Sequence, residues 1–417
     1  MIQPERLLKR FLTYVQLDTT AGEPGGTYPS SPGQLVLGRL LADELKGMGL
    51  ADVEFTPEGL VYATVPSTLG AEATKLAPVV AFNAHVDTSP ETTGKNVRPQ
   101  VIRNYAGGDI ALPADTSRVI TVKQNPELDS LKGKTLVTTD GTTLLGADDK
   151  SGIAVIMEMA QHLLEQPELK HGPVRILFTC DEEIGHGIDH VDLRKLGATV
   201  CYTLDGSGAG EVDVETFSAD LATVKVTGIN IHPSIAKGRM VNALRAVGTF
   251  LDRLPRVGHS PETTADRQGF LHPYDLTGGV AEASLKVLLR DFDTADLSGK
   301  GDLLKKLARE VEAEHPGCKV EVHIKKQYRN LGDGLAKEPR AAAYAVEAHQ
   351  RLGREAKLTI IRGGTDGSQL TERGLPTPNL STGEHNPHSP LEWTCLEEMV
   401  AAVEVCSELV QVWASKK

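Results

Sequence analysis

A buried strand that ends in three consecutive carboxylates constrains this sequence more than any other feature. Residues 173–180 form a mostly apolar run, typical of a strand buried on both faces, and Asp181, Glu182 and Glu183 follow it directly. Neighbouring carboxylates at the end of a buried strand repel one another, and this repulsion is unfavourable unless a nearby positive charge offsets it. The segment therefore predicts a cation site at the end of this strand.

Short apolar segments and helical segments alternate through the first half of the chain. Residues 78–87, 173–181 and 198–206 are predicted strands, whereas 32–49 and 150–166 have the apolar spacing of helices. Continuous apolar strands between helices favour a mostly parallel central sheet that helices cover on both faces. The fold class predicted from this pattern is α/β.

The pattern changes between residues 217 and 326. Strands there alternate apolar and polar residues, and helices separate them in an order that resembles βαββαβ. Such alternation is typical of a small α+β domain with one solvated sheet face. A chain of 417 residues is longer than a domain with a single hydrophobic core usually is. We therefore predict a catalytic domain formed by 1–216 and 327–417, interrupted by an inserted domain at 217–326.

Composition and charge argue against several classes of protein. A formal net charge of −12 disfavours nucleic acid and anionic membrane as partners. No apolar stretch approaches the roughly 20 residues of a membrane helix. The five cysteines never form a CxxC pair, which disfavours a disulfide framework or a zinc ribbon. Residues 1–17 resemble a first helix and not a signal peptide, so we expect a cytoplasmic protein.

Polar residues cluster where the predicted strands end. His85 and Asp205 each follow an apolar run, and Asp148 lies just before the helix at 150–166. Ligand sites of open α/β sheets lie beyond the carboxyl ends of the strands, so these side chains should meet those at 181–183. Imidazole and carboxylate are zinc ligands in catalytic sites, and two neighbouring ions need a bridging carboxylate. We therefore predict two divalent metal ions at this edge.

Each part of this cluster also has an ordinary structural explanation. A single HxD pairing such as His85 and Asp87 is common by chance, the DEE run could be a solvated turn, and the ADDKSG segment at 147–152 could cap a helix. On a strand, however, His85 and Asp87 point to the same side, so Asp87 can orient the imidazole. The joint occurrence of these pieces at strand ends favours the metal interpretation.

The resemblance to a known family rests on six segments. The chain resembles, over essentially its whole length, the dizinc metallopeptidases that include carboxypeptidases, aminoacylases and dipeptidases. Residues 85–112 resemble the tripeptide aminopeptidases among them in particular. The segments are 85–90, 143–152, 178–187, 202–211, 229–243 and 386–393.

The resemblance implies a role for each residue of the predicted metal site. Two zinc ions are expected, with cobalt or manganese as possible substitutes. His85 and Asp205 would hold one ion, Glu183 and His388 would hold the other, and Asp148 would bridge them.

Catalytic roles follow from the same resemblance. Glu182 would be the general base, and Asp87 would orient a metal-binding histidine. His385 is the alternative to His388 as a ligand, but the spacing of His388 and Glu392 fits the family better. A cis peptide bond is also expected, between Asp148 and Asp149.

The inserted domain is expected to be ferredoxin-like and to act as a lid and dimerisation domain, with a hinge near residues 217 and 327. By resemblance, His232 and Arg290 of this domain would contact the substrate. Arg362 begins a segment whose glycines allow close backbone approach to a ligand, and it is a third candidate.

The implied function is hydrolysis of the N-terminal residue from tripeptides by a zinc-bound water that Glu182 activates. One alternative keeps the metals and changes the substrate, as in a deacylase or carboxypeptidase that acts on N-acylated or C-terminal substrates. Another is a metal-bound binding module without catalysis. Short peptides are the expected partners, with a homodimer through the inserted domain also expected.

Overall fold

The computed structural model describes residues 2–23, 25–50 and 52–416, and the chain divides into two compact units. The first unit contains Met1–Val214, Gly334–Thr359 and Thr365–Lys417, and the second contains Glu215–Asp333 and Ile360–Gly364. Our prediction placed the last of these segments in the catalytic domain. It belongs to the second unit because the Phe217 N–H donates to the Ile361 carbonyl at 3.2 Å.

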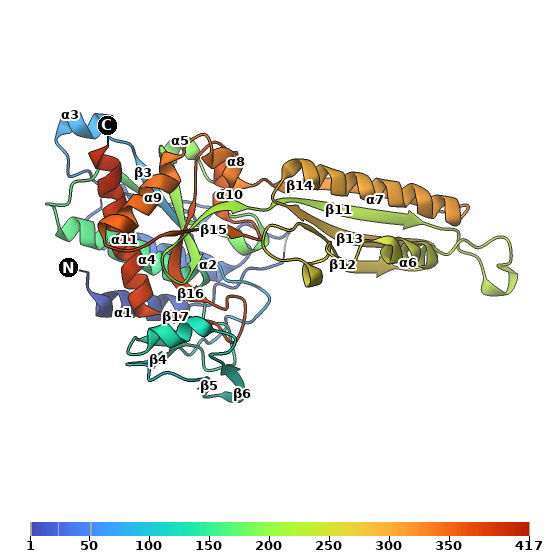
Figure 1. Cartoon of the computed structure of the whole chain (residues 1–417), viewed down its shortest axis with the longest axis horizontal. Coiled ribbons are helices and arrows are strands. Elements are labelled where there is room, and N and C mark those ends of the chain that lie inside the picture. Colours follow the sequence, from blue (N-terminus) through green and yellow to red (C-terminus); the bar gives the residue numbers. More distant parts are fainter. Residues whose placement is uncertain (1, 24, 51, 417) are drawn as a thin grey trace. The chain divides into compact units, whose positions relative to one another are not determined.

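The first unit is built on a large mixed sheet (Figure 1). Its parallel part consists of four neighbouring strands, and the strands beyond them pair antiparallel. The linker between β16 and β17 is short, and a parallel pair needs a long crossover connection, so β17 pairs with β16 in the antiparallel direction. The parallel strands are β8 (Val174–Thr179), β3 (Val80–His85), β9 (Val200–Ser207) and β16 (Asn379–His385).

The remaining strands of the first unit flank this centre. On one side lie β2 (Val61–Val65) and β1 (Glu54–Phe55), and on the other β17 (Trp393–Cys395), β7 (Leu136–Thr138) and β4 (Gln100–Ile102). The strands β10 (Glu211–Thr216) and β15 (Lys357–Ile361), whose last two residues are assigned to the second unit, pair with each other, and β10 also pairs with β16. A separate hairpin joins β5 (Ile110–Leu112) and β6 (Asp115–Ile120).

Helices pack on both faces of the large sheet. The helix α4 (Ala147–Glu165) packs on β3, β9 and β16, and α11 (Leu396–Ser415) packs on α4 and β16. Trp413 Nε1 of α11 donates to the hydroxyl of Tyr202 on β9 at 2.8 Å. On the other face, Leu177 and Cys201 pack with residues of α5 (Leu193–Leu196) and α10 (Asp366–Glu372). The other helices are α1 (Pro4–Val15), α2 (Pro32–Gly47), α3 (Ala71–Leu76), α8 (Leu331–Leu335) and α9 (Arg340–Arg351).

The second unit is a four-stranded antiparallel sheet in the order β12, β13, β11, β14. Its elements follow one another as βαββαβ, the ferredoxin-like arrangement expected from the sequence. The elements are β11 (Ser218–Thr227), α6 (Ala243–Arg253), β12 (Phe270–Gly278), β13 (Glu282–Asp291), α7 (Thr294–Glu314) and β14 (Lys319–Tyr328).

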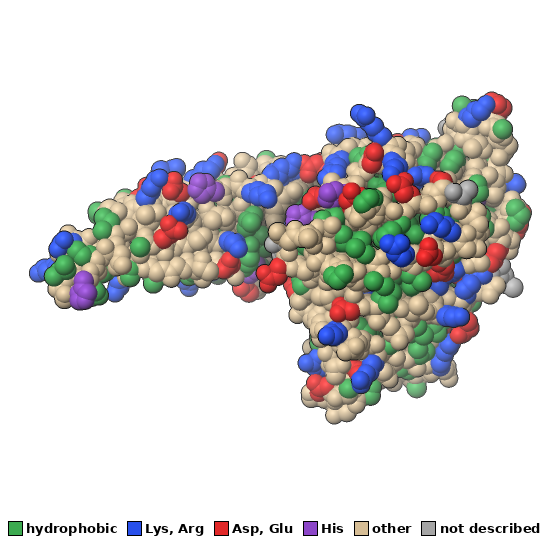
Figure 2. Space-filling view, turned by 180° about the vertical axis from the view of Figure 1, so that it is seen from behind, with side chains coloured by type: hydrophobic (Ala, Val, Ile, Leu, Met, Phe, Trp, Pro, Cys, Tyr) green, Lys and Arg blue, Asp and Glu red, His purple; other side chains and the backbone are tan. Residues whose placement is uncertain are grey.

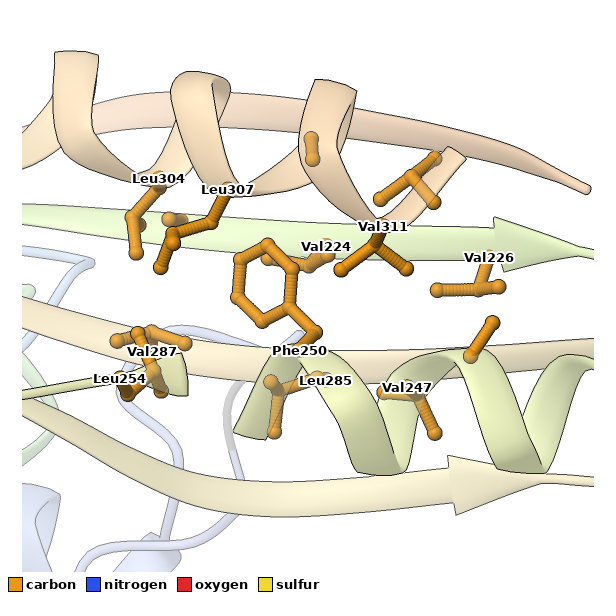
Figure 3. Packing of buried hydrophobic residues seen from close by; sticks show 14 of the residues in the cluster. Val224, Val226, Val247, Phe250, Leu254, Leu285, Val287, Leu304, Leu307 and Val311 are labelled. Carbon is orange, nitrogen blue, oxygen red and sulfur yellow. The ribbon is translucent and has the colours of Figure 1, made fainter. Parts of the chain in front are cut away.

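The core of the second unit lies between its two helices and one face of its sheet. Alternate residues of β11, among them Val224 and Val226, point inward because side chains on a strand alternate between faces. Figure 3 shows Phe250 of α6 packed among these valines and Leu307 of α7. Both helices therefore cover the same face, and the opposite face of this sheet is left to polar side chains such as Lys225.

The two units carry mixed surface charge. On the face seen in Figure 2, basic and acidic side chains are interspersed, and the acidic excess is not gathered into one patch there. Among the described residues, no helix combines the length and the apolar character that crossing a membrane would require.

Candidate metal centre

Parallel strands bring the predicted metal residues to one edge of the large sheet. His85 ends β3, Asp205 lies near the end of β9, and the single helical turn Glu182–Ile184 follows β8. Asp148 lies at the start of α4, and His388 lies in the segment between β16 and β17. All of these residues belong to the first unit.

Asp148 stands between the two histidines. Its Oδ1 lies 3.0 Å from Nε2 of His85, and its Oδ2 lies 3.1 Å from Nε2 of His388. Nε2 of His388 is also 3.0 Å from Oε2 of Glu183, and Nε2 of His85 is 3.7 Å from Oδ1 of Asp205. The structure thus brings together all five residues predicted as ligands, with one oxygen of Asp148 directed at each histidine.

The donor atoms of this cluster suit divalent cations. Ligand atoms of His85, Asp148 and Glu183 all lie within 4.8 Å of one another. Glu183 Oε1 is buried and has no hydrogen-bond partner among the described residues. A buried carboxylate oxygen without a partner is costly unless it binds a cation. The residues present therefore fit two ions that accept nitrogen and oxygen ligands.

Charge repulsion inside the cluster is visible in the pKa values. Burial, together with the charge of Asp148, raises the pKa of Glu183 to about 8 and that of Asp205 to about 6. Burial lowers the pKa of His388, but its contacts with Asp148 and Glu183 outweigh burial and raise it to about 12. The carboxylates around the histidines thus favour a positive charge at this place, which bound metal ions would supply.

Asp87 connects His85 to the turn that carries the two glutamates. Nδ1 of His85 lies 3.2 Å from the Asp87 carbonyl oxygen and 3.4 Å from its carboxylate. The same carboxylate accepts the backbone N–H groups of Glu182 and Glu183, each at 3.1 Å. Asp87 therefore holds His85 and the glutamate turn in one arrangement.

Asp181 does not take part in the cation cluster, which corrects the expectation for the carboxylate run as a whole. Its carboxylate accepts the Ser30 N–H at 2.7 Å and Nε2 of Gln34 at 2.6 Å. These donors lie at the start of α2, far away in the sequence, so no local pattern revealed them. Only Glu182 and Glu183 are left to face the cluster.

Glu182 lies next to the metal residues, and its environment favours proton transfer. Burial raises its pKa well above the usual value, and the charges of Asp205, Asp366 and Glu183 act in the same direction against the opposing effect of His85. A carboxylate whose pKa is raised holds and releases a proton closer to neutral pH.

His385, the alternative ligand, lies outside the cluster. Its ring stacks on Trp393 with centroids 3.7 Å apart, and its Nε2 lies 2.8 Å from Oε2 of Glu398. Nδ1 lies 3.5 Å from Oε1 of Glu127. His385 is therefore held by aromatic and carboxylate partners, whereas His388 is the histidine that faces Asp148. The expected cis peptide bond between Asp148 and Asp149 is present.

Several residues of the site were not assigned from the sequence. Glu384, near the end of β16, has an oxygen within 4.8 Å of those of Asp148 and Asp205. Asp149 accepts the His85 N–H at 3.1 Å. Glu384 is a carboxylate near the end of a strand, and this pattern could have identified it. It was missed because β16 itself was not predicted.

Glu392 anchors the segment that carries Asp148. Its fully buried carboxylate accepts the N–H groups of Leu145 at 2.6 Å, Gly146 at 2.8 Å and Asp148 at 3.1 Å. The sequence had singled out this residue only by its spacing from His388. In the structure it joins the segment after β16 to the start of α4.

The three predicted substrate residues belong to the second unit, and their relation to the metal centre stays a prediction. His232 begins a short exposed turn, and its Nδ1 lies 2.7 Å from the Ser234 hydroxyl. The Arg290 guanidinium contacts the Tyr328 hydroxyl. Arg362 donates to the carbonyls of residues 266 and 268 at 2.6 and 2.9 Å, which gives it a structural role within its own unit.

The family of the chain follows from comparison with known proteins. A family model described as peptidase family M20/M25/M40 matches residues 135–412. This chain belongs to that peptidase family. The predicted resemblance to metallopeptidases, the α/β fold class and the assignment as an enzyme are thereby confirmed.

Relatives of nearly the same length support this assignment. Peptidase T of Caldanaerobacter subterraneus subsp. tengcongensis is 42% identical over 411 residues, which cover 99% of each chain. Peptidase T of Bacillus subtilis is 41% identical over 98% of each chain.

Solved structures show the same fold. A tripeptidase from Staphylococcus aureus aligns with a TM-score of 0.77 at 24% identity over 100% of both chains. Aminopeptidase PepT from Bacillus cereus aligns with a TM-score of 0.75 at 21% identity over 99% of this chain and 100% of that chain.

Proposed function

We propose that this chain is an aminopeptidase with two zinc ions that releases the N-terminal residue from tripeptides. The observation that carries the proposal is the position of Asp148, whose two oxygens face His85 and His388 at 3.0 and 3.1 Å. A carboxylate so placed suits a bridge between two ions. The similarity to peptidase T over nearly the whole chain supports tripeptides as the substrate class.

Five residues would hold the ions. Two divalent ions bound there would lower the pKa of a water molecule and polarise the scissile carbonyl group. Zinc is the ion we expect, with cobalt or manganese as substitutes, because sites of nitrogen and oxygen ligands accept all three. His85 and Asp205 would hold one ion, Glu183 and His388 the other, and Asp148 would contact both.

Glu182 moves the proton in this proposal. It takes a proton from the attacking water and passes it to the nitrogen of the leaving amine. Asp87 keeps Glu182 in place, because the Asp87 carboxylate accepts the Glu182 N–H at 3.1 Å. The raised pKa of Glu182 favours both steps, since the carboxylate is a stronger base than an exposed one.

The substrate would be recognised through its charged ends. His232 and Arg290 are proposed contacts for the reacting carbonyl oxygen and the terminal carboxylate, and Arg362 is a further candidate. They would reach the substrate through closure of the second unit about a hinge near residues 217 and 327. A homodimer formed through the second unit is also proposed.

A peptide panel tests the substrate assignment. The metal-loaded protein is incubated with a free tripeptide, its N-acetylated form, the matching dipeptide and tetrapeptide, and with the tripeptide plus a chelator. Cleavage of the free tripeptide alone, stopped by the chelator, supports an aminotripeptidase. Cleavage of the acetylated peptide, or release of the C-terminal residue, would assign the site to a deacylase or carboxypeptidase. No turnover with bound metal would indicate a binding module.

A further inference from the structure

A cavity of about 250 Å³ lies beside β16 within the first unit, and none of the predicted metal or catalytic residues lines it. One wall is the helix α11, through Ala402, Val405 and Cys406, and another is β16, through Leu380. His349 of α9 also lines the cavity. The function proposed above makes no use of this space.

The cavity has room for an aliphatic group. An apolar protein cavity of about 150 Å³ is large enough to bind benzene. The wall formed by Leu380, Ala402 and Val405 is aliphatic, so it favours a branched hydrocarbon side chain over a polar one.

A polar group without a partner lines the same space. The side chain of His349 is 4% exposed, and its Nδ1 has no hydrogen-bond partner among the described residues. Burial, and then the charge of Arg354, lower the pKa of His349, so its ring is neutral at pH 7. A buried polar atom of this kind is stabilised when a ligand supplies the missing hydrogen bond.

Charged groups of both signs stand around the cavity. Arg354 lines it, and its guanidinium donates to the Glu404 carboxylate and to the Ala401 carbonyl oxygen, the latter at 3.4 Å. A guanidinium has five N–H groups, so further ones are left to donate. Glu398, also in the lining, contacts Nε2 of His385 at 2.8 Å, and the exposed Glu355 completes the charged part of the wall. A ligand that carries one positive and one negative group beside a hydrocarbon chain would match this distribution.

We propose that this cavity binds a free α-amino acid with a branched aliphatic side chain. The side chain lies against Leu380, Ala402 and Val405, and the carboxylate of the ligand accepts hydrogen bonds from Arg354. The ammonium group faces Glu355 and Glu398, and His349 provides the inner hydrogen bond. This site is separate from the metal centre, and its occupancy does not depend on hydrolysis.

Calorimetric titration of L-leucine into the metal-loaded protein tests the proposal. Ala402→Leu places a larger side chain in the cavity, and Ala414→Leu makes the same change on α11 away from the lining. We expect Ala402→Leu to weaken leucine binding by at least about tenfold, and Ala414→Leu to leave it unchanged. Val405→Phe, which fills the cavity from another position, gives the same test if Ala402→Leu does not fold.

Two leucine analogues test the recognition of both charged ends. 3-Methylbutylamine lacks the carboxylate, and 4-methylpentanoate lacks the ammonium group, so each should bind at least about tenfold more weakly than leucine. Equal binding of either analogue would overturn the proposed ligand class. Absence of leucine binding to the wild type, or leucine binding that persists in both filled variants, would overturn the site itself.

Discussion

Replacing Glu392 by glutamine should weaken metal binding although Glu392 is not a proposed ligand. Its carboxylate accepts three backbone N–H groups, at residues 145, 146 and 148, and Asp148 is the proposed bridge between the ions. Glutamine has the same shape, but only one of its two terminal groups accepts a hydrogen bond. The substitution therefore changes the anchor of Asp148 and leaves every ligand atom in place.

The size of the effect follows from the hydrogen bonds. If the amide oxygen of the new glutamine keeps the bonds to Leu145 and Gly146, its NH₂ group faces the Asp148 N–H, donor against donor. One hydrogen bond to a charged group is lost, and one buried N–H is left without a partner. Leaving this N–H without a partner costs about 1 to 3 kcal/mol of local stability. A change in the support of a metal ligand typically lowers metal affinity by about 10- to 100-fold.

The assay is competition for zinc against a chelating dye, at a pH well above 7, because burial raises the pKa of Glu392 to about 7. Urea unfolding of the metal-free protein measures stability in parallel. Glu397→Gln is the matched control, since Glu397 accepts a single backbone N–H, from Thr135 at 2.8 Å, and the glutamine oxygen can keep that bond. If both variants bind zinc as the wild type does, the proposed anchoring of Asp148 is refuted.

Three further predictions concern the cluster itself. Glu182→Ala should retain both ions in metal analysis and lose at least about 100-fold in kcat, and near-normal turnover at full occupancy would remove Glu182 as the base. His388→Ala should lose zinc in equilibrium dialysis whereas His385→Ala keeps it, and the reverse result would exchange their roles. The metal-free protein should lose thermal stability as the pH rises from about 5 to 8, because Glu183 and Asp205 have raised pKa values, of about 8 and 6, in the folded state. The stability that such groups contribute is fully present below the pKa values of the unfolded state, and it is lost as the pH rises through the pKa values of the folded state. A melting temperature that increases between pH 5 and 8 would contradict the described repulsion.

The sequence predicted the parts of the site that lie at strand ends. His85, Asp205 and the glutamates after β8 follow apolar runs, and the geometry of parallel strands brings such ends together. His388 lies in an irregular segment, so only the resemblance to a family indicated it. The partners of Asp181 could not be predicted, because Ser30 and Gln34 are distant in sequence and their hydrogen bonds exist only in the folded chain.

The fold shows the same limit. Three of the four central strands of the large sheet, β3, β8 and β9, were predictable from their continuous apolar character. The fourth, β16, was not located, and neither was β12. Its sequence contains Pro273, and its pairing with β13 is irregular between Pro273 and Asp275, which disturbs the alternation of apolar and polar residues. As an edge strand, it forms because β13 offers a partner, and not because of its own pattern.

The number of zinc ions bound per chain tests the central claim most directly. Four proteins are dialysed against buffered zinc, and their metal content is measured by mass spectrometry. They are the wild type, Asp148→Ala, Asp205→Ala and a control, Asp115→Ala, whose residue is partly exposed and lies in the hairpin of β5 and β6. We predict two ions for the wild type and the control, and one ion for Asp205→Ala. Asp148→Ala should bind both ions more weakly than the wild type does, because Asp148 would contact both. Two ions retained by Asp148→Ala, or a single ion in the wild type, would contradict the account.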